Sequence, residues 1–286
     1  MHCEIQPKPQ LGAAKKVNPS VPVEGGVTEC SVLDPWTELR RFTTARIALG
    51  RSGGSVPTRE LLDFRLAHAR ACDAVLTFFD PLALAERLEV FSLPVVTLES
   101  AASDRAEYLQ RPDRGRKLAF HSKSILKEMA AQLPACDLVI IVSDGLSTLA
   151  ANTQCEPVLA ALLPLLRESG WTLGPLVVAR HARVALQDEV GAILRARISL
   201  MLLGERPGLG SADSLGAYFT FGPAPGKSDA ERNCVSNIRP GGLSPVAAAR
   251  KLHWLLCESN RIGLSGIALK DDTGQIGVPE QAPPLA

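Results

Sequence analysis

A glycine-rich loop at residues 204–210 is the part of this chain best suited to hold a ligand. It follows an apolar run at 198–203 and reads Gly-Glu-Arg-Pro-Gly-Leu-Gly. α/β sheets bind ligands at the carboxyl ends of their strands, and glycines let a ligand approach the backbone. The spacing lacks the G-x-G-x-x-G of dinucleotide sites, and no Gly-Lys-Ser/Thr follows as in a Walker loop. The loop therefore predicts a ligand other than an ordinary nucleotide.

Two further loops are predicted at the same edge of the sheet. Residues 143–147 follow a β-branched apolar run, and residues 180–186 follow a second one. Because the carboxyl ends of parallel strands meet at one edge, we expect these loops to lie near 204–210. A simpler interpretation also exists, in which Asp144 is only a helix cap.

A fourth candidate is the segment 229–240, where many hydrogen-bonding groups surround Cys234. No histidine lies near this cysteine in the sequence, and a lone cysteine is more often a small buried residue than a nucleophile. Glu205 and Arg206 could likewise form only an ion pair within their loop. Since no combination of nucleophile, base and acid is recognisable, the sequence favours a binding subunit over a self-sufficient enzyme. We predict no catalytic residue on this chain.

Alternating strand and helix patterns predict the elements that position these loops. The alternation indicates an α/β fold with a doubly wound, mostly parallel sheet of the Rossmann-like type. Predicted strands cover residues 94–98, 137–142, 176–179, 198–203, 218–221 and 264–269, and predicted helices cover 104–110, 158–167, 187–195 and 245–260.

Four regions are predicted along the chain. They are a flexible tail at 1–30, an N-terminal helical segment at 31–93, the α/β domain at 94–273 and a second tail at 274–286. Within the helical segment, a helix capped by Thr58 is expected to run until Pro81 kinks or ends it. Its arginines could be solvated on helix faces or could contact an acidic or phosphate-bearing partner. The first tail could have no role or could be an arm that binds a partner.

The composition of the chain argues against several classes of function. The 31 Lys and Arg residues balance 30 Asp and Glu residues, which argues against a nucleic-acid or membrane-surface role. No apolar run approaches the roughly 20 residues of a membrane helix, and the first 20 residues are polar and lack a signal core. Seven dispersed cysteines without a C-x-x-C pair indicate reduced thiols in the cytoplasm, and the five histidines lack metal-ligand spacing. We therefore predict no disulfide and no metal site.

Several longer motifs go beyond these general patterns, among them Arg-Asn-Cys-Val-Ser-Asn-Ile-Arg at 232–239. The others lie at residues 39–51, 57–62, 108–113, 182–186, 204–209 and 264–266. Together they closely resemble the small (light) subunit of adenosylcobalamin-dependent ethanolamine ammonia-lyase. The resemblance runs from about Asp34 to Leu269.

The resemblance implies a role in holding a cofactor. In this family the α/β domain of the small subunit lies against the corrin ring of adenosylcobalamin, and the large subunit, a β/α barrel, binds ethanolamine and carries the reacting side chains. The family's corrin contacts correspond to Val184, Glu205 and Cys234 of this chain, within three of the four segments chosen above. The implied reaction begins with homolysis of the cobalt–carbon bond, and it converts ethanolamine to acetaldehyde and ammonia.

The resemblance also implies a hetero-oligomer with the large subunit, and it makes a bacterial microcompartment shell a candidate partner of residues 1–30. No histidine is preceded at two positions by aspartate, as in the Asp-x-His-x-x-Gly motif that replaces the cofactor's own base. We therefore expect dimethylbenzimidazole to stay on cobalt. Two alternatives remain: a nucleotide-binding dehydrogenase domain, which only the α/β pattern favours, and a purely structural subunit that never touches the cofactor.

Overall fold

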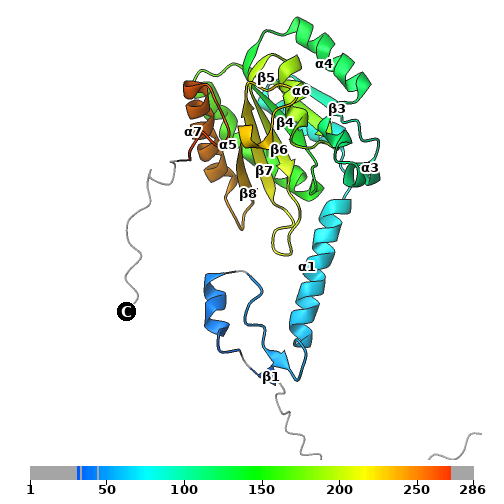
Figure 1. Ribbon diagram of the computed structural model, residues 1–286, viewed down its shortest axis with the longest axis vertical. Coiled ribbons are helices and arrows are strands. Elements are labelled where there is room, and N and C mark those ends of the chain that lie inside the picture. Colours follow the sequence, from blue (N-terminus) through cyan, green and yellow to red (C-terminus); the bar gives the residue numbers. More distant parts are fainter. Residues whose placement is uncertain (1–30, 33, 44, 272–286) are drawn as a thin grey trace, which may run out of the picture. The chain divides into compact units, whose positions relative to one another are not determined.

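The computed structural model describes residues 31–32, 34–43 and 45–271 (Figure 1). The predicted tails at 1–30 and 274–286 lie outside the described residues. The chain divides into two compact units, residues 1–58 and 59–286. In the first, β1 (Ser31–Val32) pairs antiparallel with β2 (Arg51–Ser52). This unit also contains a 3-10 helix, η1 (Thr37–Phe42).

The second unit is built on a six-stranded sheet with the order β3-β5-β4-β6-β7-β8. Its strands are β3 (Val95–Glu99), β4 (Cys136–Ser143), β5 (Leu173–Arg180), β6 (Ala196–Gly204), β7 (Leu215–Phe221) and β8 (Arg232–Ile238). The first four strands of this order are parallel, while β7 and β8 are antiparallel to their neighbours. The predicted α/β fold with a mostly parallel sheet is therefore confirmed.

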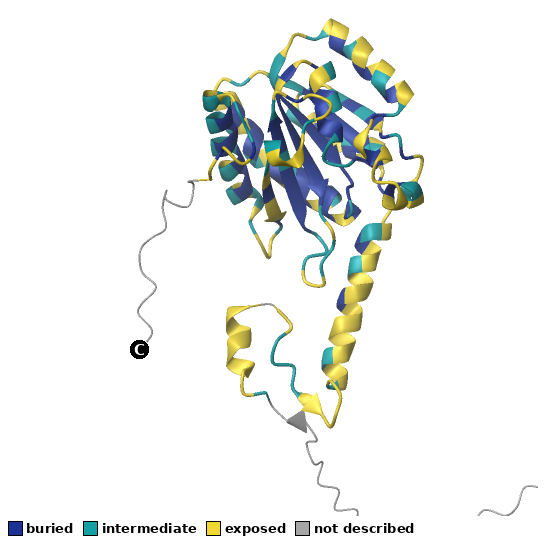
Figure 2. Ribbon diagram, in the orientation of Figure 1, coloured by how far each residue is buried: buried dark blue, intermediate teal, exposed yellow. Residues whose placement is uncertain are grey.

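Helices cover both faces of the sheet (Figure 1). The α-helices are α1 (Thr58–Leu76), α2 (Pro81–Leu88), α3 (Arg105–Gln110), α4 (Phe120–Gln132), α5 (Thr148–Glu168), α6 (Leu186–Ile193) and α7 (Pro245–Ile262). Buried side chains of α2, α5 and α7 pack on one face, and those of α4 and α6 pack on the other. The run Leu-Val-Ile-Ile-Val at 138–142 supplies side chains to both cores in alternation, because successive residues of a strand point to opposite faces. Figure 2 shows the sheet as the buried centre of this unit.

The prediction for Pro81 was wrong. α1 already ends at Leu76, and Pro81 begins a new helix rather than ending an old one. Asp80 caps this helix: its Oδ1 accepts hydrogen bonds from the backbone N–H groups of Leu82 and Ala83 at 3.0 and 3.1 Å. Proline is favourable at the first helical position because its missing N–H would have no partner there.

The predicted strand at 264–269 is also wrong, since these residues form turns. The sixth strand is β8, which lies within the candidate segment 229–240, where no strand was predicted. β8 is an edge strand, so only Val235 and Ile238 are buried while Cys234, Ser236 and Asn237 face outward. This composition lacks the continuous apolar run of a buried parallel strand.

Two helices bear on the predicted organisation. Leu84 and Leu88 of α2 lie in the same core as the sheet, so this helix packs within the α/β unit. The domain boundary proposed at 93/94 remains a prediction.

α5 is long and apolar enough to cross a membrane by length and composition, contrary to the expectation that no such segment exists. Its apolar side chains fill the larger core, which accounts for their character.

Candidate functional site

The loops that follow β4, β5 and β6 meet at one edge of the sheet, as their position in the sequence predicts. The backbone N–H of Leu146 donates to the carbonyl of Gly204 at 2.9 Å, and the N–H of Ala182 donates to the Ser143 hydroxyl at 3.1 Å. A Cβ on Gly204 would lie 2.1 Å from the Ser147 carbonyl oxygen and 2.4 Å from that of Asp144. Gly204 is therefore required by the neighbouring loop, rather than by the close approach of a ligand.

A buried carboxylate fixes this edge. Asp144 is fully buried, and its Oδ1 accepts the backbone N–H of His181 at 2.8 Å and the Ser143 hydroxyl at 3.0 Å. Its Oδ2 accepts Nη1 of Arg105 at 3.0 Å and lies 3.2 Å from Nδ1 of His181. The cap of α5 is Ser147, so the interpretation of Asp144 as a helix cap is wrong. Asp144 instead links three segments that are distant in the sequence.

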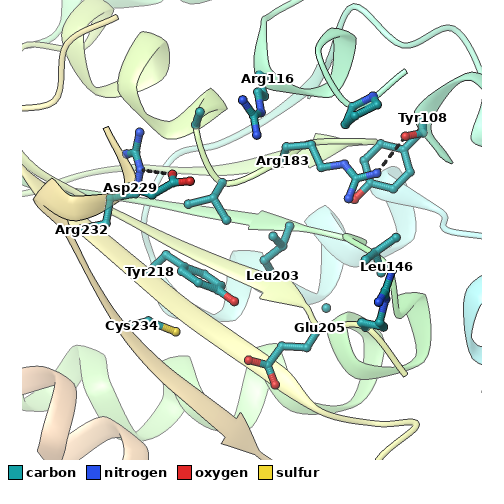
Figure 3. A pocket seen from close by; sticks show the side chains of 15 residues that line it. Tyr108, Arg116, Leu146, Arg183, Leu203, Glu205, Tyr218, Asp229, Arg232 and Cys234 are labelled. Carbon is teal, nitrogen blue, oxygen red and sulfur yellow. Dashed lines mark hydrogen bonds and ion pairs between the residues drawn. The ribbon is translucent and has the colours of Figure 1, made fainter. Parts of the chain in front are cut away.

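A cleft with a volume of about 720 Å³ opens beside this cluster (Figure 3). One wall is the sheet face formed by β6, β7 and β8, and it includes Leu203, Glu205, Tyr218, Arg232 and Cys234. The opposite wall includes Tyr108, Pro112, Arg116, Arg183 and Val184. A pocket of this size, apolar with a few polar groups, has the character of an organic-ligand site.

Glu205 is held in place on the sheet wall. Its Oε2 accepts the Ser214 hydroxyl at 2.5 Å and the backbone N–H of Asn237 at 3.2 Å. A Cβ on Gly216 would lie 2.8 Å from Oε1 of Glu205, so this glycine leaves the room that the carboxylate occupies. Glu205 is therefore not paired with Arg206, as the ion-pair interpretation required, but is fixed by β7 and β8.

Cys234 lies beside Tyr218 on the same wall, because the two residues pair across β7 and β8. Desolvation by the surrounding protein atoms raises the pKa of the Cys234 thiol to about 11, and the nearby Glu205 carboxylate adds to the rise. Burial likewise raises the pKa of Tyr218. Both groups are therefore neutral at physiological pH, and Cys234 has little thiolate with which to act as a nucleophile.

Arg232 joins the sheet wall to α6. Its Nη1 and Nη2 atoms each lie 2.7 Å from one oxygen of Asp188, and both side chains are only 4 % exposed. Nη1 also donates to the Thr220 hydroxyl at 2.9 Å. A buried bidentate pair of this kind fixes geometry, since removing either partner would leave an uncompensated charge.

The comparisons with known proteins agree on one family. Residues 33–270 match the model of the ethanolamine ammonia-lyase light chain (EutC). Three similar proteins are each called ethanolamine ammonia-lyase small subunit. That of Pseudomonas putida is 51 % identical over 240 residues, covering 84 % of this chain and 88 % of the relative. That of Rhodopseudomonas palustris is 52 % identical over 236 residues, covering 82 % and 90 %. That of Bradyrhizobium diazoefficiens is 52 % identical over 240 residues, covering 84 % and 91 %. The chain belongs to the ethanolamine ammonia-lyase light-chain family.

The three residues selected by resemblance to this family lie on the same cleft. Glu205 and Cys234 come from the sheet wall, and Val184 comes from the loop that leads into α6. Val184 is half-buried and packs against the core that α4 and α6 form. Their roles toward a ligand stay predictions.

Sequence reasoning missed several lining residues, most clearly Tyr108 and Tyr218. Tyr108 lies in the motif at 108–113 that contributed to the resemblance, so that motif was the available signal. Tyr218 had been assigned only to a strand. Its position opposite Cys234 depends on the register between β7 and β8, which the sequence does not specify.

The pKa of Cys234 predicts a specific pH dependence of alkylation. Because only the thiolate reacts, the rate with iodoacetamide should rise about tenfold per pH unit from 7 to 10, whereas an ordinary thiol with a pKa of about 8.5 levels off above pH 9. Mass spectrometry of the Cys234 peptide follows the rate, and the Cys234→Ser variant confirms the assignment. A plateau of the rate at this peptide near pH 8.5 would contradict the geometry described.

Proposed function

We propose that this chain forms part of the adenosylcobalamin site of an ethanolamine ammonia-lyase, together with the large subunit. The single observation that carries the proposal is that Val184, Glu205 and Cys234 line one cleft although they belong to three separate segments. The match to the light-chain family over residues 33–270 supports the same assignment.

The residues present fit a corrin. A corrin is a broad, mostly apolar ring whose rim carries neutral amide side chains. Leu203, Val184 and Tyr218 supply apolar contact area, and the Glu205 carboxylate can accept hydrogen bonds from amide N–H groups. The neutral thiol of Cys234 is small and adds no charge beneath the ring. These side chains bind and orient the ring, and the apolar surface excludes water from it.

The proposal divides labour between two chains. When bound, the cofactor supplies radical chemistry through homolysis of its cobalt–carbon bond, which is how the conversion of ethanolamine to acetaldehyde and ammonia starts. We expect this chain to supply binding contacts only, since the raised pKa of Cys234 leaves little thiolate to act as a nucleophile. The large subunit is proposed to provide the substrate site, so activity requires both chains in a hetero-oligomer. Placement of this complex in the cytoplasm, or within a microcompartment through residues 1–30, is part of the same proposal.

Binding measurements on the reconstituted complex test this function. With the large subunit present, adenosylcobalamin should bind, and ethanolamine should be converted to acetaldehyde. Glu205→Gln should weaken cofactor binding about tenfold, as expected for the loss of one hydrogen bond to a charged group. Val184→Phe should weaken it as well by filling the cleft. Glu128→Gln, an exposed position on α4, is the matched control and should change nothing.

The outcomes separate the alternatives. If neither cleft variant changes the affinity, the chain is a purely structural subunit. Binding of a nicotinamide cofactor by the isolated chain, with no activity in the pair, would favour the dehydrogenase alternative instead.

The cobalt ligand provides a separate prediction. Among the described histidines, only His181 has a buried ring nitrogen, Nε2, without a hydrogen-bond partner. Its ring stacks on Tyr108 at a centroid distance of 5.7 Å, and it is absent from the cleft lining. We therefore expect dimethylbenzimidazole, not His181, to remain on cobalt. EPR of cob(II)alamin in complexes with ¹⁵N-histidine-labelled chain should show unchanged splitting, and a changed splitting would establish histidine ligation.

A further inference from the structure

The wall of the cleft opposite the sheet carries two arginines that the proposed corrin contacts do not use. Arg183 follows β5, and Arg116 ends the short 3-10 helix η3 (Arg114–Arg116) (Figure 3). Within the described part of the chain, neither side chain forms an ion pair with a carboxylate. By contrast Arg232, on the sheet wall, is neutralised by Asp188. The wall formed by Arg116 and Arg183 is therefore cationic.

Arg183 is held in a fixed position rather than moving freely in solvent. Its guanidinium carbon lies 4.1 Å from the centre of the Tyr108 ring, and its Nη2 donates to the Tyr108 carbonyl at 3.0 Å. Tyr108 is itself fully buried, and its ring also contacts the ring of His181 and the guanidinium of Arg105. Stacking on an aromatic face leaves the edge of the guanidinium available for a ligand.

Arg116 is brought to the same wall by a close backbone contact. The N–H of Arg183 donates to the carbonyl of Gly115 at 2.7 Å. A Cβ on Gly115 would lie 2.8 Å from Cγ of Arg183, so only glycine allows the two segments to approach this closely. Gly115 therefore packs directly against Arg183, and Arg116 is the next residue of η3.

Two buried polar atoms on this wall have no partner. They are Nε of Arg183 and the hydroxyl oxygen of Tyr108. An unsatisfied buried polar group costs about 1–3 kcal/mol, and such groups in native proteins normally have a partner. The positive charge of Arg116 and Arg183 at the cleft indicates that a negatively charged group binds to this wall.

We infer that Arg116 and Arg183 form a subsite for the phosphodiester of the cofactor's nucleotide arm. This inference rests on the proposed function. The amides of a cobalamin are neutral, and the phosphodiester carries a negative charge. A guanidinium matches phosphate oxygens in charge and in planar geometry. Glu205 on the opposite wall repels an anion. The bound cofactor should therefore be oriented with its phosphodiester at Arg116 and Arg183.

Cobinamide tests the inference because it keeps the corrin but lacks the phosphodiester and the nucleotide base. Absorbance titration of the complete complex with hydroxocobalamin and with cobinamide would measure both affinities. Arg116→Gln and Arg183→Gln should each weaken hydroxocobalamin binding about tenfold or more, the scale of a charge-assisted hydrogen bond. Cobinamide affinity should stay within about twofold, since the lost contact is absent from it. Arg183→Lys should give an intermediate loss because charge remains but the planar group does not.

Arg114→Gln is the matched control, two residues before Arg116 in the same 3-10 helix. Arg114 pairs with Glu107 at 2.9 Å and is absent from the cleft lining, so both corrinoids should bind this variant as they bind the unaltered chain. Arg116 is exposed, which makes Arg116→Gln the variant least able to disturb folding.

Each result has one meaning. Equal weakening of both corrinoids in the cleft variants would overturn the phosphodiester assignment, as would unchanged binding of both. In either case the proposed function would stand, provided the unaltered complex binds hydroxocobalamin. If the unaltered complex binds neither corrinoid, the proposed function itself fails.

Discussion

The buried carboxylate of Asp144 is the interaction on which the candidate site depends. It ties the end of β4 to the end of β5 through His181, and to α3 through Arg105. Arg105 also donates to the carbonyls of residues 145 and 146, so the turn into α5 is held by the same side chain. Because a fully buried carboxylate without these donors would be strongly unfavourable, the three segments must assemble together. Tyr108, and through it Arg183, take their positions from this assembly.

The cleft follows from the change of strand direction in the sheet. The parallel strands β3, β5, β4 and β6 require crossover helices, and these helices cover both faces. β7 and β8 are added antiparallel without a crossover helix, and their face next to α6 forms one wall of the cleft. A pocket that is open on one side suits a subunit whose ligand-binding site is completed by another chain. The proposed division of labour with the large subunit agrees with this architecture.

Most of the parallel core could be predicted from the sequence, and the antiparallel edge could not. β4 contains five consecutive apolar residues at 138–142, a pattern typical of a strand buried on both faces. In β8 only Val235 and Ile238 are buried among polar residues, so its sequence resembles a loop. α4 was not predicted at all, because only Ser122, Leu126 and Ala130 are buried on it. The loops of the site could be located by their position after strands. The partners of Asp144 could not, since Arg105 lies 39 positions away and is placed by tertiary structure.

The choice of Val184, Glu205 and Cys234 came from family resemblance, and physical reasoning alone had reached only the segments that contain them. Their meeting on one cleft is what turns three separate predictions into one proposed site. The most direct test is an electron cryo-microscopy structure of this chain in complex with the large subunit and hydroxocobalamin. We expect corrin density in the cleft, in contact with all three residues. Corrin density enclosed by the large subunit alone, with this cleft empty, would contradict it.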